Sequence, residues 1–158
     1  FADLLRHIGV ILSDQGDFNG AIANFEEARE ILDNNGMARS DKYAHVLRSI
    51  GVVQWRRREL QEAMATFNHA RQLYEDATAT RSPEYGQLLL RIGHVHEDRC
   101  LIDVAMQHYK QAQAIYDAVG AARRPRYAMV LRSIGNVHHT RGDDAAALAE
   151  YSRAEEIF

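Results

Sequence analysis

Hydrophobic residues follow a helical spacing along the whole chain. Between Tyr43 and Val53, apolar side chains recur every three or four residues, which places them on one face of a helix. In the stretch that follows, Ala63, Phe67 and Ala70 form a second apolar stripe with polar residues around it. The pattern therefore predicts an all-α fold built from pairs of amphipathic helices.

The pattern repeats every 42 residues. A segment ending in Ile-Gly returns at each period, with its glycines at Gly9, Gly51, Gly93 and Gly135. An alanine and then an aromatic residue follow each glycine in the same register, at Ala21 and Phe25, Ala63 and Phe67, Ala105 and Tyr109, and Ala147 and Tyr151. Four units are predicted, near 1–40, 41–82, 83–124 and 125–158.

Turn residues divide each unit into two helices. Gly16 and Gly142 interrupt their units where a helix end needs positive φ, and Ser82-Pro83 reads as an N-cap followed by proline at the first helical position. The first helices are predicted near 2–15, 41–57, 83–99 and 125–141. The second helices are predicted near 18–34, 60–77, 102–119 and 144–158.

The repeated glycines lie in the middle of the first helices. Glycine costs about 1 kcal/mol relative to alanine there. That cost is expected only where a neighbouring group fills the space, so these glycines are interpreted as packing residues and not as a phosphate-binding loop.

This arrangement resembles the tetratricopeptide repeat, whose signature includes a Leu-Gly pair, an alanine and a phenylalanine in paired helices. Here the pair is Ile-Gly. The period is 42 residues and not the usual 34 or so, which is similar to the kinesin light chain and nephrocystin-like subgroup. The resemblance covers residues 1–158 and implies one superhelical array, an α-α solenoid of about four hairpins. The chain is expected to be a piece of a longer protein.

The resemblance also implies a binding surface. In such arrays the first helices line a concave face, and residues one and five positions after the repeated leucine point into it. The implied lining residues, together with two residues one turn further along, are Arg6, Val10, Arg48, Val52, Trp55, Leu90, His94, Arg132, Asn136 and His139. Arginine holds carboxylates and tryptophan offers a large contact area, so an acidic peptide with an apolar anchor would suit this surface. A solvated face is the alternative.

Two sharper sites are suggested by short motifs. Arg132 and Asn136 lie four residues apart and resemble half of a carboxylate clamp, but the corresponding positions in the other units are apolar. His96 and Cys100 are also four residues apart, a spacing that suggests a metal site. Because the other histidines are scattered and lack the paired spacing of zinc sites, packing is the favoured interpretation of His96, and no metal is expected.

Short runs of arginine occur at Arg56-Arg57-Arg58 and at Arg123-Arg124 with Arg126. They fall near predicted helix ends, where cations complement terminal carbonyls and solubilise the chain. A contact with phosphate or an acidic partner is the alternative. Neither run has the interleaved aromatic residues of a single-strand binder.

Composition narrows the remaining possibilities. The net charge of −3 provides no basic excess for nucleic acid, and no apolar run is long enough for a membrane span. The single cysteine, Cys100, cannot form an internal disulfide, so a cytoplasmic location is expected. No nucleophile or Gly-rich phosphate loop supports catalysis, so the protein is predicted not to be an enzyme and to need no cofactor.

Two functions remain in view. The first is a scaffold that binds a peptide or protein through the concave face. The second is a structural module that self-associates or stacks through its ends, because Tyr151, Ala154 and Ile157 form an apolar stripe with no cap after it. An array that regulates a fused catalytic domain is a third possibility.

Overall fold

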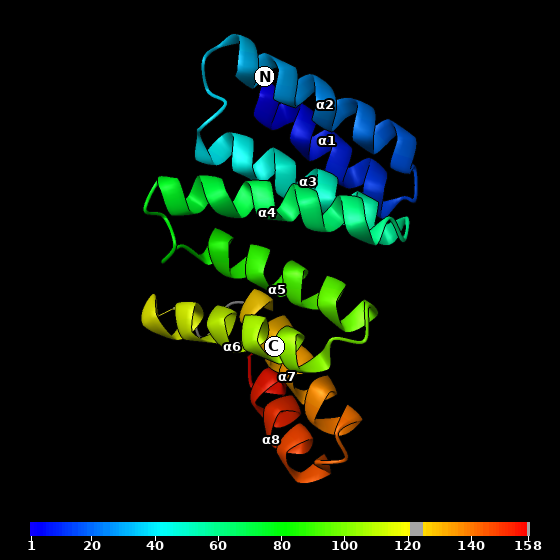
Figure 1. Cartoon of the computed structure of the whole chain (residues 1–158), viewed down its shortest axis with the longest axis vertical. Coiled ribbons are helices and arrows are strands. Elements are labelled where there is room, and N and C mark those ends of the chain that lie inside the picture. Colours follow the sequence, from blue (N-terminus) through cyan, green and yellow to red (C-terminus); the bar gives the residue numbers. More distant parts are fainter. Residues whose placement is uncertain (121–124, 158) are drawn as a thin grey trace. The chain divides into compact units, whose positions relative to one another are not determined.

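The computed structural model describes residues 1–120 and 125–157 as eight α-helices and no strand. Each first helix is followed by a partner that returns alongside it, so the described chain consists of four helical hairpins (Figure 1). The helices are α1 (Ala2–Asp14), α2 (Phe18–Asn34), α3 (Asp41–Arg56), α4 (Leu60–Asp76), α5 (Pro83–Asp98), α6 (Ile102–Ala118), α7 (Pro125–Thr140) and α8 (Asp144–Glu155).

The predicted all-α fold and the predicted helix positions are confirmed. Seven helices begin and end within a residue of the predicted bounds. The exception is α8, which ends at Glu155 and not at 158. Arg123, Arg124 and Phe158 lie outside the described residues.

Serine side chains cap two of the first helices, and the cap at Ser82 is the one predicted from the sequence. Ser40 Oγ accepts a hydrogen bond from the Tyr43 N–H at 3.2 Å, and Ser82 Oγ accepts one from Tyr85 N–H at the same distance. The turns between the helices of the first and last hairpins use Gly16 and Gly142 at positive φ, as predicted. At the same place in the other hairpins, Arg58 and Cys100 take positive φ without being glycine.

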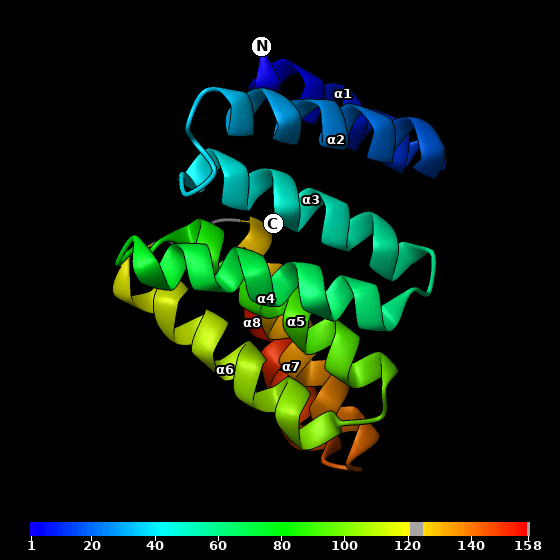
Figure 2. The same ribbon diagram turned by 45° about the horizontal axis from the view of Figure 1, so that its top comes forward.

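The chain divides into two compact units. Unit 1 runs from Phe1 to Ala79 and contains α1 to α4, and unit 2 runs from Thr80 to Phe158 and contains α5 to α8. In unit 1, α3 packs against α2 and also contacts α1, and the closeness of α2 and α3 is visible in Figure 2. In unit 2, α7 packs against α6. Each unit is therefore two hairpins joined by the same type of contact.

Each hairpin closes on a contact between a glycine and an aromatic ring. A Cβ placed on Gly51 would lie 2.5 Å from Cε1 of Phe67, which is fully buried. A Cβ placed on the corresponding glycines of the other hairpins would lie 2.3 to 2.5 Å from the rings of Phe25, Tyr109 and Tyr151. The packing role predicted for the four glycines is confirmed.

A tyrosine at the start of the second hairpin of each unit joins it to the first. The Tyr127 hydroxyl donates to Asp117 Oδ1 at 2.6 Å, and the Tyr43 hydroxyl donates to Asp33 Oδ2 at 3.4 Å. Burial raises the pKa of both hydroxyls, so both stay protonated as donors. In unit 2 the Tyr127 ring also lies 5.7 Å from that of Tyr116, within an apolar cluster that includes Val130, Ile134 and Val137.

Among the described residues, no helix is both long enough and apolar enough to cross a membrane.

Replacing Gly51 by alanine is expected to lower the free energy of unfolding by about 1–3 kcal/mol, because the added methyl overpacks the buried Phe67 ring. On helix propensity alone, the same change would stabilise α3 by about 1 kcal/mol. Urea unfolding followed by circular dichroism measures the difference. In a Phe67→Leu background the penalty should shrink, and a Gly51→Ala protein as stable as the wild type would contradict the packing role.

Candidate interaction surface

Five of the residues predicted to bind a partner lie in unit 1. Arg6 and Val10 are on α1, and Arg48, Val52 and Trp55 are on α3, and all five are half-buried. The two helices contact each other, so the structure holds these side chains on neighbouring elements. Arg6 Nη2 donates to the ring of His7, next to it in sequence, at 2.7 Å.

Arg56 ties the two first helices of unit 1 together at their carboxyl ends. Its Nη1 donates to the Ser13 carbonyl oxygen at 2.7 Å and to Ser13 Oγ at 2.9 Å. The guanidinium also lies 5.0 Å from the centre of the Phe18 ring and its Nη1 is 3.5 Å from Asp14. Arg56 thus complements a terminal carbonyl, as expected for this arginine run, but the carbonyl belongs to the neighbouring α1 and not to α3 itself.

The other five predicted residues lie in unit 2 and differ in exposure. Leu90 on α5 is only 2% exposed and belongs to the apolar cluster between α5, α6 and α7. His94 is half-buried, whereas Arg132, Asn136 and His139 on α7 are exposed. Leu90 is thus placed where it supports the surface and not where a partner would touch it.

His94 joins α5 to α7. Its Nε2 lies 3.1 Å from Ser133 Oγ, and the Ser133 hydroxyl in turn donates to the Met129 carbonyl at 3.0 Å. Because the hydroxyl proton is used in that bond, Ser133 Oγ accepts from His94, which therefore carries its proton on Nε2. Burial, with the nearby charge of Arg91 and a smaller effect of Arg132, lowers the pKa of His94 to about 4, so the ring is neutral at neutral pH.

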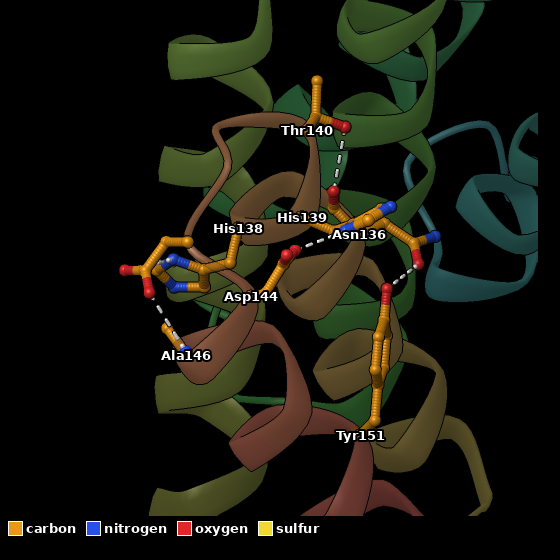
Figure 3. A network of polar contacts seen from close by, with 8 residues as sticks. Asn136, His138, His139, Thr140, Asp144, Ala146 and Tyr151 are labelled. Carbon is orange, nitrogen blue, oxygen red and sulfur yellow. Dashed lines mark hydrogen bonds and ion pairs between the residues drawn. The ribbon is translucent and has the colours of Figure 1, made fainter.

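Asn136 and His139 belong to a polar network between α7 and α8 (Figure 3). Asn136 Oδ1 accepts from the Tyr151 hydroxyl at 2.8 Å, and His139 Nδ1 lies 2.7 Å from Asp144 Oδ1. Thr140 Oγ1 donates to the Asn136 carbonyl at 2.9 Å. These bonds fix the orientation of both side chains while leaving them at the surface.

Arg132 is the most available cation on the first helices of unit 2. Within residues 1–120 and 125–157 it has no hydrogen-bond or ion-pair partner. It borders an apolar pocket of about 270 Å³ between α7 and α8, which the sequence does not predict. The pocket is lined by Ala128, Met129, Arg132, Tyr151, Ala154 and Glu155. Its only sequence signal is the uncapped apolar stripe of the last hairpin.

Several histidines are engaged in ring contacts, including His96 of the candidate metal pair. His96 stacks on His108 with the ring centres 5.3 Å apart, and His69 meets the Tyr43 ring edge-on at 6.2 Å. The packing interpretation of His96 is consistent with this stack. In the part of the chain that the structure describes, no three His, Cys, Asp or Glu side chains gather as metal ligands would.

Acidification is expected to weaken unit 2 through His94. Its folded pKa of about 4 is below the ordinary 6.5, so the unfolded chain binds the proton first, and stability falls as the pH drops from about 6.5 towards 4. Between pH 7 and pH 4.5 the loss should be roughly 2–3 kcal/mol. Urea unfolding at a series of pH values measures it. His94→Val, which introduces the residue found at the same repeat position in unit 1, should flatten the profile over this range; an unchanged profile would contradict the assignment.

The comparisons with known proteins agree on the fold. The profile of the tetratricopeptide repeat matches residues 1–76 and 84–158. A comparison with curated proteins gives no match.

Three solved structures are similar over 99% of this chain. They are BtubC (BKLC) from P. vanneervenii, with 19% identity and a TM-score of 0.83; the Rap conjugation gene regulator of plasmid pLS20 in complex with the Phr* peptide, with 18% and 0.88; and pilF of Pseudomonas aeruginosa, with 18% and 0.75. The chain spans 62%, 41% and 60% of their respective lengths.

Proteins of this repeat type generally mediate protein–protein interactions as non-catalytic scaffolds. The profile match covers nearly all of the four hairpins, and the chain belongs to the tetratricopeptide repeat family.

Proposed function

We propose that the chain is a non-catalytic scaffold that binds a protein or peptide carrying carboxylates through the surface of its first helices. The observation that carries the proposal is Arg132, an exposed guanidinium on α7 with no ion-pair partner in the described chain. Arginine recognises carboxylates through two parallel hydrogen bonds, which gives both attraction and orientation.

Unit 1 offers a matching arginine. Arg48 of α3 stands two repeat periods before Arg132, and the sequence around both is Tyr-Ala-x-Val-Leu-Arg-Ser-Ile-Gly-x-Val. Trp55 lies on the same helix, one turn beyond Val52. It is half-buried and supplies apolar contact area. The proposed contact residues are Arg6, Val10, Arg48, Val52, Trp55, His94, Arg132, Asn136 and His139, with the buried Leu90 in support.

Peptide binding has a precedent in this fold. The Rap regulator, which is similar over 99% of this chain, was solved in complex with the Phr* peptide. At 18% identity this likeness concerns the fold alone, so the acidic character of the partner rests on the arginines of this chain.

Three further inferences complete the proposal. The 42-residue period passes from Gly51 to Gly93 without change, which supports treating residues 1–158 as one array. The same period supports the kinesin light chain and nephrocystin-like subgroup. The exposed and unpaired Cys100 supports a reducing, cytoplasmic location.

A second candidate function is self-assembly. Large apolar side chains are exposed on α1, and an apolar pocket lies open between α7 and α8. Repeat arrays normally cover such faces. Because Arg132 borders this pocket, self-assembly and acidic-peptide binding would share part of the surface of unit 2.

Charge reversal tests the binding proposal. Arg48→Glu with Arg132→Glu is expected to weaken binding of a fluorescein-labelled peptide rich in Asp and Glu, with one central Leu, by about tenfold or more, because attraction becomes repulsion. Fluorescence anisotropy measures the affinity. The same peptide with Gln and Asn in place of its acids should bind neither protein.

Two controls keep the result interpretable. Arg39→Glu changes the same charge in an exposed loop residue and should leave the affinity unchanged. Arg132→Glu alone, at an exposed position, covers the case in which the half-buried Arg48 is needed for folding. An acidic peptide that binds Arg132→Glu as tightly as wild type would reject the proposal.

A further inference from the structure

A groove in unit 1 lies between α2 and α4, with α3 as its floor. α3 contacts both helices and lies between them (Figure 2). The groove has a volume of about 270 Å³. Its lining includes Glu26 and Arg29 of α2, Leu47, Ile50 and Gln54 of α3, and Thr66 of α4. We call the space that these six residues line the α2–α4 groove.

The α2–α4 groove opens on a different face of α3 from the residues proposed to bind an acidic partner. Leu47, Ile50 and Gln54 are spaced by three and four residues, so they share one face of the helix. Arg48 and Trp55 are centred roughly 120° away around the helix axis. All three helices that form the groove belong to unit 1.

Gln54 supplies an acceptor that has no donor. Its side-chain oxygen is shielded from solvent and accepts no hydrogen bond from any described residue. An unpaired acceptor is costly inside a protein, and a donor from a bound group would remove that cost. The last torsion of a glutamine side chain is soft, so a small turn of the amide can bring this oxygen to the groove.

Two further acceptors come from the helices on either side. Arg29 Nη2 lies 2.6 Å from Glu26 Oε2, and no described residue pairs with the other carboxylate oxygen, Oε1. The Thr66 hydroxyl lies on the opposite wall. Each of the three helices therefore contributes one acceptor to the groove.

The charge around the groove favours a cation. α2 carries four acidic residues and one arginine, and α4 carries three acidic residues and one arginine. Glu26 and Arg29 pair with each other, so together they add no net charge to the groove. The potential there comes from the other acids of the two flanking helices, and it attracts positive charge.

Leu47 and Ile50 give the groove an apolar floor beside Gln54. A long side chain that ends in a cation can bury its aliphatic stem on such a floor while its head reaches polar groups. Lysine has this shape, and its ammonium carries three donors, which match the three acceptors of the groove. The small volume suits one side chain and not a drug-sized molecule.

We infer that the α2–α4 groove binds a lysine side chain of a partner protein, whose ammonium donates to Glu26, Gln54 and Thr66. This site goes beyond the proposed function, because it uses another face of unit 1 and a partner group of the opposite charge. An acidic and a basic partner segment are thus recognised on separate faces.

Unit 2 provides a comparison within the same chain. Two periods later, the residue types of the apolar floor are unchanged, whereas the positions of Glu26 and Gln54 are held by Lys110 and His138. A lysine in place of the glutamate repels a second ammonium. The site is therefore a property of unit 1 and not of the repeat in general.

A lysine-rich peptide tests the inference. The probe is a fluorescein-labelled peptide of lysines spaced by glycine and serine, and fluorescence anisotropy measures its affinity for the 158-residue chain. Gln54→Leu should weaken binding by about tenfold, because a hydrogen bond to a charged group is lost. The variant introduces the residue found at the same repeat position of the first hairpin, Leu12. Urea unfolding should show no loss of stability, because an unpaired buried oxygen is removed.

Matched charge changes separate the groove from general attraction to acidic helices. Glu26→Gln should weaken binding by about tenfold, because it removes the charged acceptor. Glu27→Gln removes the same charge from the next residue, which is exposed and outside the groove, and should change the affinity by less than about twofold. The same peptide with acetylated lysines should bind none of these proteins.

Several results would overturn the inference. They are equal affinities of Gln54→Leu and the wild type, equal losses in Glu26→Gln and Glu27→Gln, and a wild type that does not bind the lysine peptide. Spermidine that binds as tightly as the peptide would overturn the choice of a protein partner. The acidic peptide probes the other face, so its affinity for Gln54→Leu should equal its affinity for the wild type, and the two proposals can fail separately.

Discussion

The close approach of a glycine to an aromatic ring is the contact on which the rest of the structure depends. A methyl group on the glycine would lie within about 2.5 Å of ring carbons in each hairpin, so the two helices can reach their observed separation only without it. The ring then fills the space over the glycine and is itself held in place. All four hairpins share this contact, and within each unit the second hairpin packs on the first through corresponding helices.

The same repeated packing determines which faces of each unit are buried and which stay exposed. Inside a unit, the second hairpin buries its tyrosine and aliphatic face on the first, whereas other side chains of the same helix, such as Arg132, stay exposed. At α1 and α8, the faces that would pack inside a unit are exposed instead. Arg132 also borders the pocket between α7 and α8, so binding of an acidic partner and self-assembly would compete for the same part of unit 2.

The sequence predicted the helices, their order and the glycine packing, because each of these depends on a spacing of residues that recurs four times. It did not predict the bonds of Arg56 or His94. Those bonds join helices of neighbouring hairpins, and the residue types at the paired positions differ from one repeat to the next. The period indicates which positions come close, whereas the bond that forms depends on the two particular side chains. The sequence also did not predict that Leu90 is buried. At a repeat position expected to face a partner, a leucine that packs in the core cannot be distinguished by sequence from a leucine that binds the partner.

The eleven-residue segment shared by α3 and α7 has a consequence for folding. Both helices present the same tyrosine, valine and isoleucine face, so α7 could dock on the first hairpin, and α3 on the third, with nearly the same burial. One polar pair would survive the exchange, because Arg126 would meet Asp3 in place of Lys42, again a cation beside a carboxylate. The bonds of Arg56 to Ser13 would be lost, because the corresponding residue of α7 is Thr140. Among these polar pairs, only the Arg56 bonds distinguish the correct pairing from the exchanged one. The short connection between the helices favours the correct pairing. Residues 35–40 hold α3 next to α2, so α3 meets the first hairpin much faster than it meets a distant hairpin. The fidelity of this repeat depends on the shortness of its loops.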